Sequence, residues 1–572
     1  MWPFSISLPS LKDLDEEYDY VIVGGGTAGC VLANRISTDP QNKVLLVERG
    51  PADDSWASRI PLFSANFAED HKLARKLDSE EEPVIGRPVD IFQGNGLGGS
   101  TRINHMFYTR GPSGQYDRWE RNGAEGWGFK SLIPYFIKAE CAEYDANPSV
   151  HGSDGEWINR QNGPFFYSSF EHSARACEAL GLSRIPDLND PQNVPIGWAT
   201  IPVTRDSNQH RHSTFWAFLP PALIHARRIN LHVCPNTIVE RLIIEKEQGH
   251  LAVRSVALGP TGGQASSKAT VHIRVRREVV VCAGALGSPQ ILMLSGIGPA
   301  EHLSDMGIPV LQDTPVGENL QDHFGVFNNY LVPLHDSLLR VNRQPLYFIW
   351  EVLRYFLFGT GVLLAPVVQM AIFACTALLD KHGVPLEDKQ PEINSVPDVE
   401  IMPLAYAQGL AQKDATRGGF SFLTVLLTPE SKGSVRLRNI DPRAAPRIDF
   451  NYLSTLSDRM RMRHALRLVL RLARGLREQG YQLEPAEAPP LDAEVVGDDT
   501  LDRQITEQGC TTYHYTSTCA LGSVVGNDLV VKGTRNLRVA DASVFPEVPA
   551  CHLQAPVVAV AEKCANMILS IH

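Results

Sequence analysis

A glycine-rich turn between a predicted strand and a predicted helix is the feature that most restricts the fold of this chain. Residues 18–23 (YDYVIV) are a nearly continuous apolar run, which is typical of a strand buried on both faces. The turn follows at once at 24–29 (GGGTAG), and residues 30–36 (CVLANRI) have the apolar spacing of a helix. A second buried strand at 43–47 ends in Glu48, nineteen positions after the last glycine of the turn. This order predicts a Rossmann-like dinucleotide-binding unit.

The residue types in this unit each have a physical reason. Gly24 allows a tight turn, Gly26 allows the backbone to approach a pyrophosphate, and Gly29 allows the helix to pack closely on the strand. The first turn of the helix then offers free N–H groups and the positive end of its dipole to the phosphates. The carboxylate of Glu48 can accept hydrogen bonds from the ribose hydroxyls, which disfavours a 2′-phosphate. The expected ligand is therefore FAD or NAD rather than NADP.

Length and charge exclude several classes of protein. A chain of 572 residues is too long for one core and suggests two domains that share an interface. The formal net charge of −11 disfavours nucleic acid as a partner. The ten cysteines are scattered without a CxxC pair, so we predict neither a metal site nor a dithiol redox motif.

The N-terminal residues and the glycosylation pattern bear on location. Residues 1–20 lack the basic start and the long apolar stretch of a secretory signal. The only Asn-x-Ser/Thr triplet, at 147–149, has a proline in its centre, which blocks glycosylation. These features favour an intracellular location, while secretion of a processed form stays open.

Residues 355–379 contain no charged side chain and are long enough to cross a bilayer. However, Gly359, Gly361 and Pro366 would interrupt a helix in the first half of the segment. We therefore predict a buried strand–turn–helix passage and no transmembrane span. The apolar character of the segment is a weak indication of a lipophilic substrate.

Four later segments carry a resemblance to a known family. Together they resemble the signatures of the glucose–methanol–choline (GMC) oxidoreductases, and the resemblance extends from about residue 16 to residue 572. The segments are 94–104 (GNGLGGSTRIN), 284–298 (GALGSPQILMLSGIG), 316–323 (VGENLQDH) and 536–546 (NLRVADASVFP). This resemblance decides between the two remaining ligands, because GMC oxidoreductases bind FAD.

The resemblance also implies a fold of mixed class, in which an α/β domain is joined to an α+β domain. It predicts a discontinuous Rossmann-like FAD-binding domain with an inserted sheet-and-helix domain that binds the substrate. We expect the FAD-binding domain to comprise residues 14–165, 220–325 and 505–572. The substrate-binding domain is expected to comprise residues 166–219 and 326–504.

Contacts with FAD can be carried over from the family by position. The resemblance assigns Glu48 to the adenosine ribose and Val239 to adenine. It assigns the pyrophosphate to Gly24, Gly26, Thr27, Ala28 and Gly29. It assigns the ribityl chain and the isoalloxazine ring to Gly98, Gly99, Asn104, His105, Met106, Asp541, Gln554 and Ala555.

Some family members attach the flavin covalently through a histidine just before the position of Asn104. In this chain that position is Ile103, so we predict dissociable, non-covalent FAD. His105 lies beyond the attachment position, and we expect it to be a packed or hydrogen-bonded histidine beside the ring.

Two histidines near the C-terminus are the candidate catalytic residues. His514, within 513–522 (YHYTSTCALG), matches the position of the catalytic base in the family. His552, within 550–556 (ACHLQAP), matches a position that relatives fill with His or Asn. A neutral imidazole can take the proton of an alcohol near neutral pH, and a second one can orient the hydroxyl and stabilise alkoxide character.

The residues around His514 depart from the common family pattern. Tyr515 replaces a common proline, Ser517 a common glycine and Leu521 a frequent methionine. These changes keep the base but put the shape of the substrate pocket in doubt.

The predicted function is FAD-dependent oxidation of a primary alcohol, aromatic or otherwise lipophilic, to the aldehyde. Hydride would pass to flavin N5, and the electrons would go to O₂ or to another acceptor. The alternative is an FAD-containing lyase of the same family, similar to hydroxynitrile lyases or photodecarboxylases, and a flavin-binding protein without catalysis is a third possibility. The sequence sets neither the substrate nor the oligomeric state.

Overall fold

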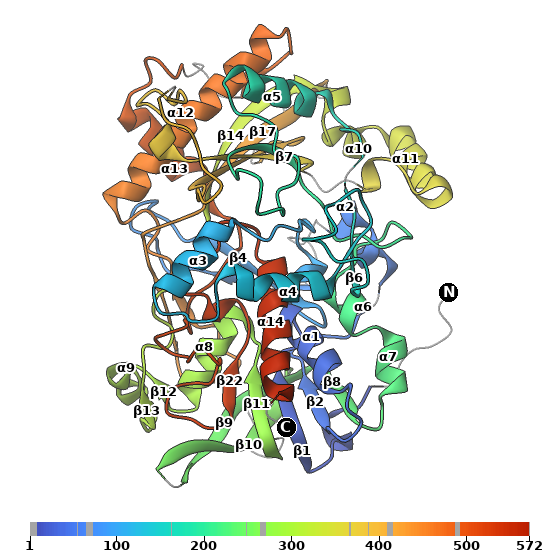
Figure 1. The fold of residues 1–572 in the computed structure, drawn as a ribbon, viewed down its shortest axis with the longest axis vertical. Coiled ribbons are helices and arrows are strands. Elements are labelled where there is room, and N and C mark those ends of the chain that lie inside the picture. The colour runs from blue at the N-terminus through green and yellow to red at the C-terminus, as the bar shows by residue number, and fades with distance from the viewer. Residues whose placement is uncertain are drawn as a thin grey trace.

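A computed structural model describes residues 8–53, 55–64, 72–161, 163–247, 249–262, 270–364, 368–386, 388–408, 416–486 and 492–570. Two large sheets dominate these residues, and each is covered by helices (Figure 1). The half that is predicted to bind FAD, which we call the FAD-binding half, lies at the bottom of the view and the second sheet at the top, with the chain passing several times between them. The mixed α/β class predicted from the sequence is confirmed.

The first sheet is the predicted dinucleotide-binding sheet. Its strands lie in the order β8-β2-β1-β11-β10-β9, and β22 pairs with β11 at 279–281, beyond the residues of β11 that pair with β10. The pairs β1–β2, β1–β11, β2–β8 and β11–β22 are parallel, whereas β10 is antiparallel to both neighbours. The strands are β1 (Glu17–Val23), β2 (Val44–Val47), β8 (Leu231–Cys234), β9 (Thr237–Glu247), β10 (His250–Pro260), β11 (Val271–Val281) and β22 (Leu537–Val539).

Helices α1 (Thr27–Ile36) and α14 (Gln554–Leu569) pack side by side against this sheet (Figure 1). Nearly every residue of α14 is buried, so this C-terminal helix is a core element of the FAD-binding half. The strand at 18–23, the helix at 30–36 and the strand at 43–47 predicted from the sequence are all confirmed.

The second large sheet is antiparallel. Its order is β20-β14-β17-β16-β15-β7, and β21 also pairs with β14. Helices α5 (Ser168–Ala179) and α12 (Leu456–Glu478) cover one face. The strands are β7 (Gly197–Thr200), β14 (Phe324–Pro333), β15 (Met370–Ala374), β16 (Val399–Leu404), β17 (Arg417–Leu426), β20 (Glu484–Pro485) and β21 (Gly509–Thr511). The residue limits given above for the two domains stay a prediction.

The alternation of side chains along β16 decides what this sheet offers to each face. Val399 and Ile401 pack in the core beneath α12 and α5. Met402 belongs to the core on the opposite face. Glu400 is two positions before Met402, so its side chain points to that same face. The second sheet therefore presents one carboxylate among apolar side chains toward the FAD-binding half.

The structure describes further elements beside those of the two large sheets. The helices are η1 (Leu11–Asp13), η2 (Trp56–Arg59), α2 (Pro61–Ser64), η4 (Gly99–Arg102), α3 (Ser113–Arg121), α4 (Phe129–Ala139), α6 (Thr214–Phe218), α7 (Pro221–Ala226), α8 (Gly284–Leu294), α9 (Ala300–Asp305), η5 (Leu334–Asp336), α10 (Leu339–Arg343), α11 (Pro345–Phe358), η6 (Val362–Leu364), η7 (Thr376–Leu378), α13 (Asp498–Gln508) and η8 (Ala542–Val544). The strands are β3 (Ala74–Asp78), β4 (Asp90–Gly94), β5 (Glu140–Ala142), β6 (Trp157–Asn159), β12 (Ile297–Gly298), β13 (Gln312–Asp313), β18 (Ser434–Arg436) and β19 (Arg447–Asp449).

The strand–turn–helix predicted for 355–379 is wrong in its order. The segment begins inside α11, which ends where Gly359 adopts a left-handed conformation with φ of 61°. The strand β15 comes afterwards and is buried between β7 and β16. Residues 365–367, which include Pro366, lie outside the described residues. Within the described part of the chain, no helix has the length and apolarity that a membrane span requires.

Candidate active site

The turn after β1 brings three stretches of backbone into close contact. Gly24 has φ of +104°, and a Cβ atom there would lie 2.5 Å from the carbonyl oxygen of Cys282. A Cβ atom on Gly29 would lie 1.9 Å from the carbonyl oxygen of Gly24, which explains why the first turn of α1 requires glycine at this position. Gly26 and Gly99 face each other, and a Cβ atom on Gly99 would lie 2.8 Å from the Gly26 Cα.

Glu48 ties the same region together from the end of β2. Its Oε2 accepts a hydrogen bond from the Gly25 N–H at 2.7 Å, and its Oε1 accepts from Gly50 at 2.7 Å and Gly96 at 3.2 Å. Burial raises the pKa of Glu48, and the three backbone hydrogen bonds oppose that effect. The carboxylate is therefore held in a fixed position at the edge of a cavity, where a ribose could meet it.

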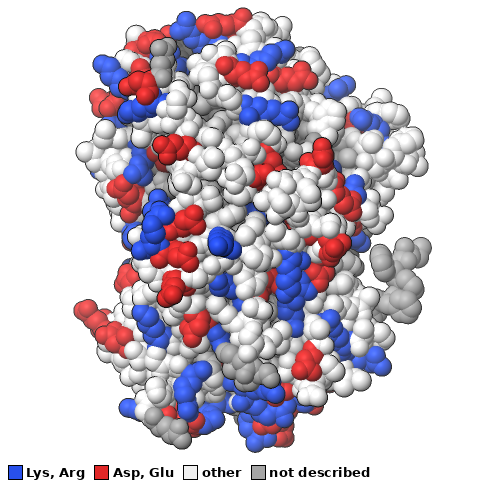
Figure 2. Space-filling view, in the orientation of Figure 1, with Lys and Arg blue, Asp and Glu red and all other residues white. Residues whose placement is uncertain are grey.

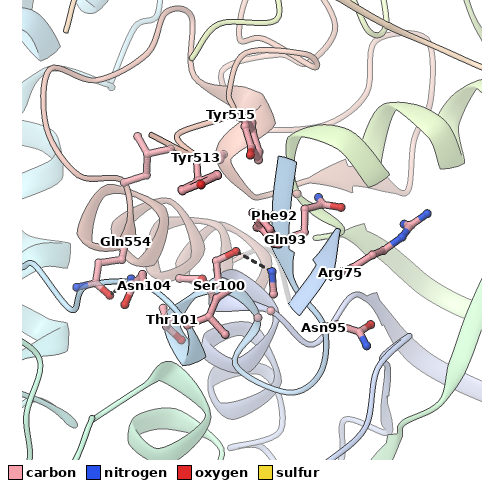
Figure 3. A pocket seen from close by; sticks show the side chains of 18 of the residues that line it. Arg75, Phe92, Gln93, Asn95, Ser100, Thr101, Asn104, Tyr513, Tyr515 and Gln554 are labelled. Carbon is pink, nitrogen blue, oxygen red and sulfur yellow. Dashed lines mark hydrogen bonds between the residues drawn. The ribbon is translucent and has the colours of Figure 1, made fainter. Parts of the chain in front are cut away.

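The turn after β1, Gly99 and Glu48 form what we call the cradle. A cavity of about 1140 Å³ extends from this cradle to the second sheet (Figure 3). That volume exceeds the roughly 300–1,000 Å³ of a site for one drug-sized ligand, so it can hold a dinucleotide and a second small molecule. Figure 3 shows Tyr513 and Tyr515 on the opposite side from Ser100 and Asn104. The predicted residues that line it are Gly24, Gly26, Thr27, Ala28, Glu48, Gly99, Asn104, His105, Val239, His514, Asp541, His552 and Gln554.

Four predicted cofactor residues lie behind the cavity wall instead. Gly29 packs against β1 as described, and Gly98 donates its N–H to the Gly25 carbonyl at 2.8 Å with φ of +90°. Met106 is buried in the core beneath the second sheet, and Ala555 is buried in the first turn of α14. These four shape the site, and none of them is among the residues that line the cavity.

A hydrogen-bonded group joins Asn104 to the start of α14. Asn104 donates from Nδ2 to Gln554 Oε1 at 2.9 Å, and Gln554 donates from Nε2 to the Phe107 carbonyl at 2.5 Å. Arg211 donates to Asn104 Oδ1 at 2.8 Å, and burial lowers the pKa of Arg211 to about 9. Burial, with Arg211 as the next cause, lowers the pKa of His105 to about 4, so His105 is neutral at pH 7.

Asp541 connects α8 to η8 at the other side of the cavity. Its Oδ2 accepts hydrogen bonds from the Gly284 N–H at 2.8 Å and the Ser288 hydroxyl at 2.5 Å. Its Oδ1 accepts from the Ser543 N–H at 2.8 Å. Burial raises the pKa of Asp541.

The two candidate catalytic histidines lie together in the wall of the cavity. Their ring centroids are 4.9 Å apart and their planes are nearly perpendicular, at 86°. His514 comes from the loop after β21, and its backbone N–H donates to Asp322 Oδ1 at 2.7 Å. His552 precedes α14, and its ring contacts Phe107 edge to face at 4.8 Å. The structure thus brings together the two imidazoles that the sequence predicted as a pair.

A third imidazole, that of His323, sets the tautomer of His514. His323 Nε2 lies 3.0 Å from the Leu427 carbonyl, which can only accept, so this nitrogen carries the proton. The Nδ1 of a neutral His323 is then an acceptor, and it lies 2.9 Å from His514 Nδ1. His514 must therefore donate from Nδ1, and the Thr512 hydroxyl at 3.3 Å is a second partner. This arrangement leaves Nε2 of His514 as the proton-accepting nitrogen.

Burial keeps these imidazoles neutral. It lowers the pKa of His514 well below its ordinary value, and the neighbouring rings of His552, His323 and His105 lower it further. Burial likewise lowers the pKa of His323 to about 3, with His552 as the next cause. Both rings are unprotonated at neutral pH, as the hydrogen-bond pattern requires.

Glu400 is a buried residue of this site that the sequence reasoning missed. Its Oε1 lies 3.1 Å from Nε2 of His552, and its side chain is 1% exposed. Because a carboxylate oxygen accepts, it fixes which edge of the His552 ring faces the second sheet. A single acidic residue in the apolar run 399–404 (VEIMPL) was a usable signal. The position of His323, directly after Asp322 in one of the family segments, was another.

Comparison with known proteins agrees with this geometry. The N-terminal sequence pattern of the GMC oxidoreductases matches residues 18–325, and the C-terminal pattern matches residues 429–561. The chain belongs to the GMC oxidoreductase family. An oxygen-dependent choline dehydrogenase of Photobacterium profundum is 31% identical over 97% of this chain and 94% of its own length.

Solved structures of the family superpose on almost the whole chain. Pyridoxine 4-oxidase from Mesorbium loti is 26% identical, with a TM-score of 0.79 over 97% of this chain and 100% of that one. A fungal aryl-alcohol oxidase is 25% identical, with a TM-score of 0.78 over 98% of this chain and 100% of that one. This GMC oxidoreductase is therefore an FAD-dependent enzyme that acts on CH–OH groups.

The cradle fits FAD on its own geometry. Gly24, Gly26 and Gly99 keep backbone rather than side chains at the point where a pyrophosphate would lie, in front of the first turn of α1. Glu48, directly after β2, is buried beside this turn, where its carboxylate can meet a ribose. From there the cavity continues to the imidazoles.

Proposed function

We propose that this GMC oxidoreductase oxidises a lipophilic or aromatic primary alcohol to the aldehyde. The observation that carries the proposal is the pair of adjacent imidazoles, His514 and His552, in the cavity wall, with the buried His323 behind His514 and apolar side chains nearby. In that arrangement a hydroxyl group is the part of a substrate that the site can recognise by hydrogen bonds.

FAD, when bound, supplies an acceptor for the hydride that leaves the alcohol carbon. His514 Nε2 accepts the hydroxyl proton, since its Nδ1 is occupied by His323. Glu400 accepts from Nε2 of His552 and so orients this ring beside His514, at the same oxygen. General-base assistance of this kind is typically worth about 10²–10⁴-fold in rate.

The walls of the cavity support a lipophilic substrate. The lining near the imidazoles includes Phe107 together with Phe327, Met402, Tyr406 and Leu423. Five such side chains disfavour a polyhydroxylated sugar, because its hydroxyl groups would lose water without gaining partners. The similarity to an aryl-alcohol oxidase supports the same substrate class.

Anaerobic reduction of the flavin by a panel of primary alcohols tests the proposal. Benzylic and medium-chain alcohols should bleach the flavin absorbance faster than sugars or choline. In His514→Ala, reduction should be slower by about 10²–10⁴-fold, while His225→Ala, a change at an exposed histidine, should leave it unchanged. If no alcohol bleaches the flavin but a cyanohydrin is cleaved or a fatty acid is decarboxylated under light, the enzyme is a lyase and the proposal is wrong.

We also propose that FAD is bound without a covalent link and that O₂ or another acceptor reoxidises it. The buried residue before Asn104 is Ile103, whose side chain cannot attach to a flavin. Denaturation in acid should release all of the yellow chromophore into the supernatant. Peroxide release measured beside dye reduction separates the two kinds of acceptor.

A further inference from the structure

The outward side of α11 is entirely apolar. Its exposed side chains, together with that of the neighbouring Trp56, form what we term the α11 face, and each is between 46% and 83% exposed. The members are Trp56, Leu346, Ile349, Trp350, Leu353, Phe356, Leu357 and Phe358. Figure 1 shows α11 projecting from the body of the protein, and Figure 2 shows that corner as mainly uncharged atoms.

The inward side of α11 holds apolar side chains and one ion pair. Tyr355 packs against Ile60, Leu363 and Leu364 in a small separate core. The one acidic side chain of the helix, Glu351, points inward, where it accepts from the Val362 N–H at 2.8 Å and pairs with Arg354 at 2.8 Å. An exposed apolar face of this extent is typical of a helix that is covered by something apolar.

The α11 face lies next to one end of the cavity. Phe348 of α11 lines the cavity and contacts Phe63 at 6.2 Å between ring centroids. Leu62, Leu338 and Val341 line the same end. An apolar molecule at the α11 face is therefore separated from the cavity by the width of one helix.

Basic residues stand beside this apolar face in a chain of net charge −11. Arg340 and Arg343 belong to α10, directly before α11. The Arg340 guanidinium lies 3.9 Å from the ring centroid of Tyr347, so an aromatic ring supports it at the rim of the face. Arginines beside exposed tryptophan, leucine and phenylalanine match the phosphate and acyl layers of a bilayer surface.

The shape of the α11 face favours a lipid surface. The face lies on one projecting helix of 14 residues, which is about 21 Å long. A projecting helix of this kind can enter a bilayer surface without further contacts.

We propose that α11 docks this enzyme on the surface of an anionic lipid bilayer, with the α11 face among the acyl chains. Docking itself does not depend on the substrate. The added consequence, that a lipophilic alcohol enters the cavity from the membrane past Phe348, rests on the proposed function.

Flotation of the holoenzyme with vesicles tests the docking. Vesicles of equal parts phosphatidylcholine and phosphatidylglycerol should carry the wild type upward, and vesicles of phosphatidylcholine alone should bind about tenfold more weakly. The triple variant Leu346→Ser/Trp350→Ser/Leu357→Ser should lose at least about tenfold in partition. The matched control Ile229→Ser/Ile440→Ser/Val495→Ser changes exposed aliphatic residues elsewhere and should bind as the wild type does.

The readout is the flavin absorbance in the floated fraction, so it is independent of turnover. Flavin content and oxidation of a water-miscible alcohol show whether the variants are folded. If the triple variant does not fold, the single variant Trp350→Ser replaces it. Equal binding by the triple variant and the wild type, or no binding by either, overturns the proposal. Sedimentation that shows a dimer in the wild type and a monomer in the triple variant also overturns it, because a second copy then covers the face.

Discussion

Replacing His323 tests whether this residue sets the proton position on His514. In His323→Leu the acceptor for the His514 Nδ1–H disappears, and only the Thr512 hydroxyl at 3.3 Å remains. The net value of a neutral hydrogen bond is about 0.5–1.5 kcal/mol, and a buried donor left without a partner costs about 1–3 kcal/mol. At about 1.4 kcal/mol per factor of ten, the expected loss in the rate of flavin reduction lies between about twofold and 100-fold.

The chain offers a graded control at the same position. In His323→Asn the side-chain Oδ1 can take the place of the His323 Nδ1, so the acceptor for His514 remains. In His323→Gln the amide instead reaches toward the Leu427 carbonyl, the partner of Nε2. We expect the Asn variant to reduce its flavin fastest, the Gln variant more slowly, and the Leu variant most slowly.

Stopped-flow reduction under anaerobic conditions, with saturating alcohol, measures these rates directly. The effect should be on the limiting rate of reduction rather than on KM, because His323 is buried behind the base and does not line the cavity. Wild-type rates in the Leu variant would refute the assignment of the tautomer. A loss as large as in His514→Ala, or equal losses in the Asn and Leu variants, would show that His323 supports the fold rather than the position of the proton.

Three further predictions follow from burial and packing. Because burial lowers the pKa of His514 well below 6.5, kcat/KM should be flat between about pH 6.5 and 8 and fall only at lower pH, and an inflection near 6.5 would contradict this. Burial opposes protonation of His151, but hydrogen bonds with Asp187 and Glu140 raise its pKa to about 9. That folded pKa lies above the unfolded value of about 6.5, so the stability it contributes, about 3 kcal/mol, is complete below pH 6.5 and is lost as the pH rises through 9. Urea unfolding below pH 6.5 and above pH 9 should show this loss of unfolding free energy in the wild type and a smaller loss in His151→Gln. Gly29→Ala should release FAD and lower the thermal midpoint, because its Cβ would lie 1.9 Å from the Gly24 carbonyl oxygen; unchanged flavin content would contradict this.

What the sequence could predict depended on how local each pattern was. The strand, turn, helix and acid from residue 17 to Glu48 follow from short-range spacing, and the structure has them in that order. The His514–His552 pair came from two positions in a family pattern, and their rings do meet. By contrast, the contact between Glu400 and His552 depends on the register of β16 in an antiparallel sheet, which no local pattern encodes.

The error at 355–379 has a related cause. Glycines near the start of that segment were interpreted as interruptions of a helix that had yet to begin, whereas Gly359 ends a helix that began at Pro345. The strand β15 is apolar because it is central in its sheet and faces a core on both sides, not because it lies in lipid or substrate. Apolarity without periodicity identified burial and could not identify which element was buried.

Burial has two opposing effects on His514 as a base. It keeps His514 unprotonated at neutral pH, so the base is available in almost every molecule. It also makes that base weak, because an imidazolium formed there would be poorly solvated. A weak base can take a proton only when the proton has become acidic, which happens as a carbonyl forms at the alcohol carbon. The orienting contacts of His323 and Glu400 then matter more than basicity, since they hold both rings in place for the moment at which the charge develops.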